Sequence, residues 1–190
     1  MSDYTVISAV SHTLHDLLRA NITDTTIGIS LKSPKDMQLT GPATGVSVWL
    51  YKVSRMAEML NEPRDRRQPN QEAAAALPVL LYYLITPITA EPLTSQTLLG
   101  KVLQVFNDHA ILRGAALRGT LHGSNEQLRI NLESLTLEEL SQVWYALSEP
   151  YQLSVTYLVQ VVKIDSELEP VQASPVLRRI SNYKQIAAVS

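Results

Sequence analysis

The stretch LPVLLYYLIT, residues 77–86, decides the fold class of this protein. It is dense in branched and aromatic side chains, which favour β-strands over helices. Proline at positions 78 and 87 leaves too little room between them for a typical helix. The sequence therefore predicts a central, buried β-strand over residues 77–86.

Alternating stretches on either side of this strand predict the rest of a β-sheet. Residues 46–53, VSVWLYKV, alternate, but their second face is apolar as well, which predicts a strand covered on both sides. Residues 151–164 alternate throughout and predict the longest strand. Shorter alternating runs predict strands at residues 25–31 and 127–132.

Three segments have the spacing of amphipathic helices. Apolar residues recur at three- and four-residue steps in residues 4–20 and 94–109. A third helix is predicted over residues 137–147, because Thr136 followed by Glu139 forms a capping box in front of it. The order α, β, β, β, α, β, α, β predicts an α+β fold, in which a single domain contains a mixed β-sheet packed with about three helices.

A polar loop interrupts this pattern. Residues 61–71, NEPRDRRQPNQ, contain no apolar side chain and cannot join a core. We expect that Arg64, Arg66 and Arg67 in this loop either contact an acidic protein surface or keep the loop soluble.

The C-terminal segment differs from the rest of the chain. Residues 165–190 lose the regular alternation and contain two prolines, yet they are too apolar for an ordinary disordered tail. We therefore expect a domain over residues 1–164 and a C-terminal arm over residues 165–190 that contacts another subunit or protein. Arg178, Arg179 and Tyr183 are the candidate contact residues of this arm.

The composition limits the class of partner. The 16 Lys and Arg residues against 18 Asp and Glu residues leave a net charge of -2, too balanced for a surface that neutralises many phosphates, so we expect no nucleic acid partner. With 45% hydrophobic and 18% charged residues, the chain is more apolar than a free monomer needs. These values favour a subunit that buries part of its surface.

The sequence also indicates where the protein is made. The absence of cysteine excludes disulfides and fits a reducing compartment, so we expect synthesis and assembly in the cytoplasm. The start of the chain lacks the basic and apolar regions of a signal peptide. The most apolar stretch, residues 73–88, is interrupted by prolines and is too short to span a bilayer, so we expect no direct membrane insertion.

No catalytic or metal-binding pattern stands out. His12 and His15 have a helical ligand spacing, but a metal needs a third converging ligand, so we interpret them as part of a solvated helix face. No serine is bracketed by glycines, and no glycine-rich phosphate loop is present. We expect no enzymatic activity, no cofactor and no metal. Five aromatic side chains are interpreted as core residues rather than a ligand-stacking set: Trp49, Trp144, Tyr82, Tyr83 and Tyr157.

Five phrases, in this order, resemble one protein family: VSVWLYKVSRMAEMLNEPRDR, LPVLLYYLITP, LLGKVLQVFNDHAIL, LRINLESLTLEELSQVWYAL and PYQLSVTYLVQVVKID. They are similar to the N-terminal domain of the cap, or tail-terminator, proteins of extracellular contractile injection systems, such as virulence cassettes and the antifeeding prophage. The likeness runs from the first predicted helix to residue 164. One departure is Ala110, where the family usually has proline.

The resemblance implies a phage tail-terminator-like α+β subunit that acts as a structural cap. Such a cap forms a homo-hexameric ring on the distal end of the particle, ends the assembly of the inner tube and sheath, and stabilises the extended sheath. Its implied partners are further copies of itself, the inner tube protein and the sheath protein, and no cofactor is implied. The residues alone leave an alternative, a monomeric small-ligand or adapter binding module without catalysis, with a large apolar cavity lined by Trp49 and the tyrosines.

Overall fold

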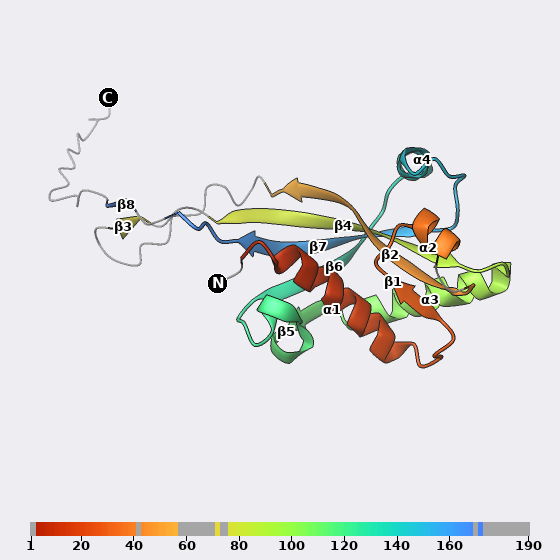
Figure 1. The fold of residues 1–190 in the computed structure, drawn as a ribbon, viewed down its shortest axis with the longest axis horizontal. Coiled ribbons are helices and arrows are strands. Elements are labelled where there is room, and N and C mark those ends of the chain that lie inside the picture. Colours follow the sequence, from red (N-terminus) through yellow and green to blue (C-terminus); the bar gives the residue numbers. More distant parts are fainter. Residues whose placement is uncertain (1–2, 41–42, 57–70, 73–75, 169–170, 173–190) are drawn as a thin grey trace, which may run out of the picture.

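Strand β4 (Leu77–Ile88) lies in the interior of the main β-sheet (Figure 1). The computed structural model of the protein describes residues 3–40, 43–56, 71–72, 76–168 and 171–172. Within them, β4 pairs in antiparallel fashion with β2 (Gly45–Arg55) on one side and β7 (Val155–Ile164) on the other. The predicted central strand is therefore confirmed, and it extends past Pro87 to Ile88.

Pro87 does not end β4, because no neighbouring group needs its missing N–H. The carbonyl oxygen of Thr44 accepts a hydrogen bond from the N–H of Gly28, so it points away from β4. Backbone groups alternate in direction along a strand, so those of Val46, two residues on, also point away from β4. Pro87 lies opposite Val46 and therefore turns its nitrogen toward the β7 side. The β7 ladder has already ended at Ile85, so the ring nitrogen leaves no acceptor unpaired.

The main sheet is six-stranded, with the order β1-β2-β4-β7-β6-β5. Its remaining strands are β1 (Gly28–Ser30), β5 (Ile111–Arg113) and β6 (Gln127–Glu133). Strand β1 runs parallel to β2 and every other neighbouring pair is antiparallel, so the sheet is mixed, as predicted. A separate two-stranded ladder, β3 (Gln71–Glu72) with β8 (Val171–Gln172), lies beyond one end of the main sheet (Figure 1).

Helices cover both faces of the sheet. Helices α1 (Val6–Asn21) and α3 (Pro92–Asp108) lie on one face, together with β5 and two short 3-10 turns (Figure 1). Helices α2 (Pro34–Thr40) and α4 (Leu137–Ala146) lie on the other. The predicted helices α1, α3 and α4 are confirmed, including the capping box of Thr136 and Glu139 on α4.

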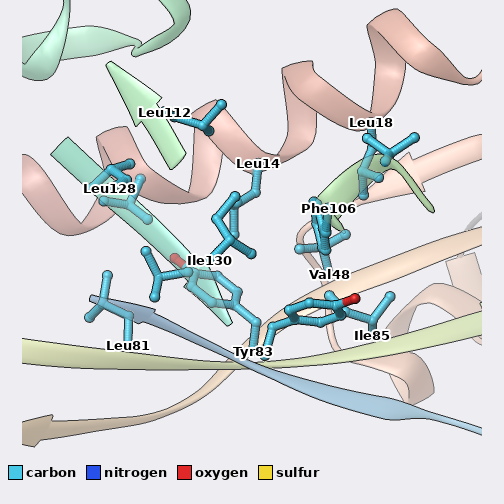
Figure 2. Close-up of a cluster of buried hydrophobic side chains, with 14 of the residues drawn as sticks. Leu14, Leu18, Val48, Leu81, Tyr83, Ile85, Phe106, Leu112, Leu128 and Ile130 are labelled. Carbon is cyan, nitrogen blue, oxygen red and sulfur yellow. The ribbon is translucent and has the colours of Figure 1, made fainter. Parts of the chain in front are cut away.

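The main core fills the space between β4, α1 and α3. Figure 2 shows Leu14 and Leu18 of α1 pointing toward Tyr83 and its neighbours on β4. Phe106 of α3 packs edge-on against Tyr157, with ring centroids 4.8 Å apart. The hydroxyl oxygens of Tyr83 and Ser11 lie 2.8 Å apart, so the buried phenol has its hydrogen-bond partner on α1. This polar contact fixes the position of α1 along the sheet.

Helix α2 was not predicted, since its sequence PKDMQLT has no repeating apolar stripe. Ser33 caps the helix, because its hydroxyl accepts the N–H of Asp36 at 3.2 Å and donates to the Asp36 carboxylate at 2.6 Å. Met37 is fully buried and packs on the face of the sheet opposite the main core. The buried residues Pro34 and Met37 hold this short helix on the sheet.

The strand predicted over residues 151–164 begins later, at Val155, and is shorter than β4. Residues 151–154 instead close over the buried Trp144 of α4. The indole Nε1 donates a hydrogen bond of 3.1 Å to the Ser154 hydroxyl, and the Tyr151 ring meets the indole edge-on at 6.4 Å. The alternation in residues 151–154 thus reflects packing on a helix, not pairing in the sheet.

Strand β2 is covered on both sides only in its first half. Residues 45–48 are buried, whereas Trp49, Leu50 and Tyr51 are half-buried and the following residues are largely exposed. The far ends of β2, β4 and β7 extend together beyond the helices (Figure 1). The prediction of a strand covered on both faces is therefore right for residues 45–48 and wrong for the rest.

Gly45 and Gly100 offer a matched pair of substitutions. A Cβ at Gly45 would collide with the carbonyl oxygen of Gly28 and with Cε of Met37, so Gly45→Ala must push β1 or α2 away from β2. We expect it to lower the free energy of unfolding by about 1–3 kcal/mol. A Cβ at Gly100 in α3 meets nothing within 4 Å, so Gly100→Ala should raise it by about 0.5–1 kcal/mol. Chemical denaturation measures both, and equal effects of the same sign would contradict this account.

Candidate functional site

An aromatic strip lies on the sheet face that α4 covers. The rings of Trp49 and Tyr51 on β2 have centroids 6.2 Å apart, and Tyr51 meets Tyr82 of β4 edge-on at 6.3 Å. The Lys52 ammonium lies 4.6 Å from the centre of the Tyr82 ring, a cation–π contact. The three rings are only half-buried, so the prediction that Trp49 and Tyr82 are core residues is wrong, whereas Trp144, Tyr83 and Tyr157 are buried as predicted.

A groove of about 480 Å³ separates this strip from α4. Its lining comes from β2, from the segment before α4 and from α4 itself: Trp49, Tyr51, Lys52, Leu135, Glu139, Gln142, Val143 and Ala146. We call it the aromatic groove. Lys52, Glu139 and Gln142 are exposed, so the groove is open to solvent along its rim.

The lining of the aromatic groove contains one acidic side chain, Glu139, and one basic side chain, Lys52. Burial, together with the nearby negative charges of Glu133 and Glu139, raises the pKa of Tyr51 to about 12. The backbone N–H of Thr136 donates to the Glu139 carboxylate at 2.8 Å, and this bond, with that of the Thr136 hydroxyl, holds the pKa of Glu139 below its usual value. The groove therefore combines an aromatic floor with a carboxylate on the α4 side, a surface suited to apolar and basic side chains.

Helix α4 is held on the sheet mainly through Trp144, its one fully buried residue. The helix turns other large apolar side chains outward, since Tyr145 is 86% exposed and Leu137 is 66% exposed. Exposed large apolar side chains on a helix beside an open groove are typical of a surface that another protein covers.

The histidines make local contacts within the fold. His15 Nδ1 lies 3.0 Å from Asp16, whose other oxygen accepts from Arg118 Nε at 3.0 Å, and these contacts lower the pKa of Asp16. The N–H of His109 caps α3 at the Val105 carbonyl. Among the residues that the structure describes, no three His, Cys, Asp or Glu side chains form a metal-binding group, and no helix has the length and apolar character needed to cross a membrane.

The contact residues predicted from the sequence lie outside the described residues. Arg64, Arg66 and Arg67 belong to residues 57–70, and Arg178, Arg179 and Tyr183 belong to residues 173–190. The aromatic groove is not among these predicted contact sites, although Trp49 and the tyrosines are the expected lining of the alternative ligand cavity. Its signal in the sequence is the second apolar face of residues 46–53, which marks a partly open surface and not full coverage.

Comparisons with known proteins place the chain in a family. A family model described as the Pvc16 N-terminal domain matches residues 9–178. The chain belongs to the Pvc16 N-terminal domain family. The resemblance seen in the sequence is thereby confirmed. No curated protein matches the chain.

Two solved structures share the fold of this Pvc16-type domain. One is the sheath/tube terminator of PVC, an extracellular contractile injection system, in the extended state, with a TM-score of 0.66 and 22% identity over 100% of this chain and 67% of that chain. The other is the tube-terminating cap of the anti-feeding prophage, with a TM-score of 0.64 and 19% identity over 92% of this chain and 60% of that chain. At these identities the likeness is one of fold, and it confirms the predicted terminator-like α+β architecture.

Replacing His12, His15, His109 and His122 together by glutamine should leave the protein folded and able to assemble. Each contact that these side chains make is local, so we expect a fall in Tm of a few degrees at most. Elemental analysis of the purified parent protein, with the quadruple variant as its control, checks for bound metal. Stoichiometric zinc in the parent that disappears in the variant would contradict the prediction.

Proposed function

We propose that this protein is a structural cap of a contractile injection system. It forms a ring on the distal end of the particle, ends the assembly of the inner tube and the sheath, and stabilises the sheath in its extended state. The observation that carries the proposal is the membership of the Pvc16 N-terminal domain family, supported by the fold shared with a sheath/tube terminator and a tube-terminating cap.

The surface of the domain supports a role in assembly. The aromatic groove, the outward apolar residues of α4 and the strand ends that extend beyond the helices all offer area for other subunits. The groove lies between β2 and α4, and the strand ends continue beyond the helices. A ring built from head-to-tail contacts needs two different surfaces of this kind on each copy.

The proposed partners are further copies of this chain in a homo-hexameric ring, the inner tube protein and the sheath protein. Assembly takes place in the cytoplasm, and the cap then remains part of the particle. The protein is not an enzyme in this proposal, since its two similar solved structures are a terminator and a cap.

The aromatic groove favours a second candidate, a small-ligand or adapter binding module without catalysis. Trp49 and Tyr51 line it, as that alternative expected, and its volume of about 480 Å³ would hold a small molecule. Its exposed rim and charged lining fit a protein segment better than an enclosed ligand. A thermal-shift screen that finds a small molecule binding there, abolished by Trp49→Ala, would favour this candidate.

Particles made without this protein test the cap proposal. An uncapped, self-complementary end continues to accept subunits, so we expect tubes or sheaths of irregular length, or prematurely contracted particles. Electron microscopy of particles from a deletion strain and a complemented strain measures the lengths, and the complemented particles should carry a six-subunit ring at the distal end. Uniform particles of normal length from the deletion strain, or a two-fold dimer without affinity for tubes, would refute the proposal.

We also propose that residues 1–164 form the terminator-like domain and that residues 165–190 form an arm that contacts a neighbouring subunit or the sheath. The described part of the arm supports this division. Among the described strands, Val171 and Gln172 pair with Gln71 and Glu72, in a ladder separate from the main sheet.

Truncation after Ile164 separates these two roles. Because the main core is built from residues before this point, we expect the Tm of the truncated chain to lie within a few degrees of the full chain. Capping should weaken, as measured by the fraction of particles of normal length when the truncated chain replaces the full one. A truncated chain that fails to fold would place the arm in the core and reject the division.

A further inference from the structure

The outer edge of β2 is open over most of its length. Strand β1 pairs with residues 45–47 only, and the chain then turns into α2. No described strand pairs with this edge from residue 48 to 55. The Thr44 carbonyl points to this edge. Every second residue of the strand does the same, so Val46 and Val48 also direct their N–H and C=O groups outward. We call residues 48–55 the open edge.

The open edge has the features of a strand acceptor. Exposed edges are commonly protected by proline, by bulges or by charged side chains, and residues 48–55, VWLYKVSR, contain no proline. A register shift between Leu50 and Lys52 divides this edge, and Arg55 stands at its end. The ammonium group of Lys52 is held over the Tyr82 ring on the sheet face. Val53 is 47% exposed, so the edge also offers apolar contact area. An added strand would pair with backbone groups that no described strand occupies.

The aromatic groove lies beside the open edge and indicates what such a strand would contain. Trp49, Tyr51 and Lys52 belong to both surfaces, so a strand added to β2 would bring side chains next to the groove. The aromatic floor suits apolar side chains, and the Glu139 carboxylate suits a basic one. A strand that places apolar and basic residues two positions apart, on the same face, matches both.

Residues 173–190 of this chain have that composition. They contain Arg178, Arg179 and Lys184 and no acidic residue, together with a set of large apolar side chains: Val176, Leu177, Ile180, Tyr183 and Ile186. In the chain, the segment follows directly after β8, and β8 itself lies beyond the end of the main sheet (Figure 1). Its residues can span about 60 Å when extended, at roughly 3.3 Å per residue, which is enough to reach an adjacent subunit.

We propose that residues 173–190 of a neighbouring copy add a β-strand to the open edge of β2. Successive side chains of a strand point to opposite faces, so one face carries Arg178 between Val176 and Ile180, and the other carries Arg179 with Leu177. Either face places apolar side chains next to the aromatic groove and one arginine toward Glu139. Backbone hydrogen bonds supply affinity and the alternate side chains supply register. The inference rests on the ring proposed above, because a head-to-tail ring needs one surface that donates and a different one that accepts.

Photo-cross-linking in the full chain identifies the occupant. A benzophenone amino acid in place of Val53 is mixed with an excess of isotopically heavy, unsubstituted chain, irradiated and digested for mass spectrometry. We expect cross-links to heavy peptides from residues 173–190. The same photoreactive residue at Ala115, exposed in the first 3-10 turn and away from β2, is the control and should not reach that segment. Links from position 53 only to the light segment of the same copy, or to other heavy peptides, would overturn the proposal.

A peptide assay tests the acceptor without requiring a ring. A labelled peptide of residues 173–190 is titrated with the full chain, and fluorescence anisotropy gives its affinity. We expect about tenfold weaker binding with Trp49→Ala, and about tenfold weaker binding of a peptide carrying Arg178→Glu and Arg179→Glu. Tyr145→Ala is the control and should leave the affinity unchanged, since Tyr145 does not line the groove.

The two assays keep the proposals distinguishable. A ring that forms although the peptide does not bind, or binds Trp49→Ala equally well, would reject the strand acceptor and leave the cap proposal intact. Specific peptide binding by a protein that never forms a ring on tubes would support the acceptor and reject the cap ring.

Discussion

The structure depends on the pairing of β4 with a partner strand on each edge while side chains on both its faces are buried. Leu81, Tyr83 and Ile85 face α1 and α3, and Leu84 and Thr86 are buried on the opposite side. A strand in this position needs helices on both faces of the sheet, because its apolar surface would otherwise meet water on one side. The two helical layers, including the short α2, follow from this requirement.

The same arrangement leaves one region of the sheet uncovered. The helices are shorter than the strands they cover, so the ends of β2, β4 and β7 extend past them, and β1 pairs with only the first residues of β2. The edge and the groove beside it combine backbone groups that no described strand pairs with, aromatic rings and the Glu139 carboxylate. An edge with these properties is a liability in a free monomer and useful in a subunit that binds its neighbours.

The family match and the side-chain contacts of the domain both favour a protein that binds other proteins. The family match covers residues 9–178, and the fold is shared with a sheath/tube terminator and a tube-terminating cap. Within the described residues, the ionisable side chains take part in caps, turns and surface pairs, such as Asp16 between His15 and Arg118. Such contacts stabilise local structure, and they leave the aromatic surfaces as the part of the domain best suited to recognition of other proteins.

The sequence by itself determined the central strand, three of the helices, the capping box at Thr136 and the α+β class, because apolar periodicity and cap residues report local backbone geometry directly. Periodicity does not report which element covers a face, so tertiary structure decided the rest. Residues 34–40 form a helix because Met37 can pack on the sheet. Residues 151–154 leave the sheet because they contact Trp144 instead. Trp49 and Tyr51 line a groove because α4 does not lie directly against them. Each of these outcomes depends on contacts between residues far apart in the chain, which the local pattern of side chains cannot specify.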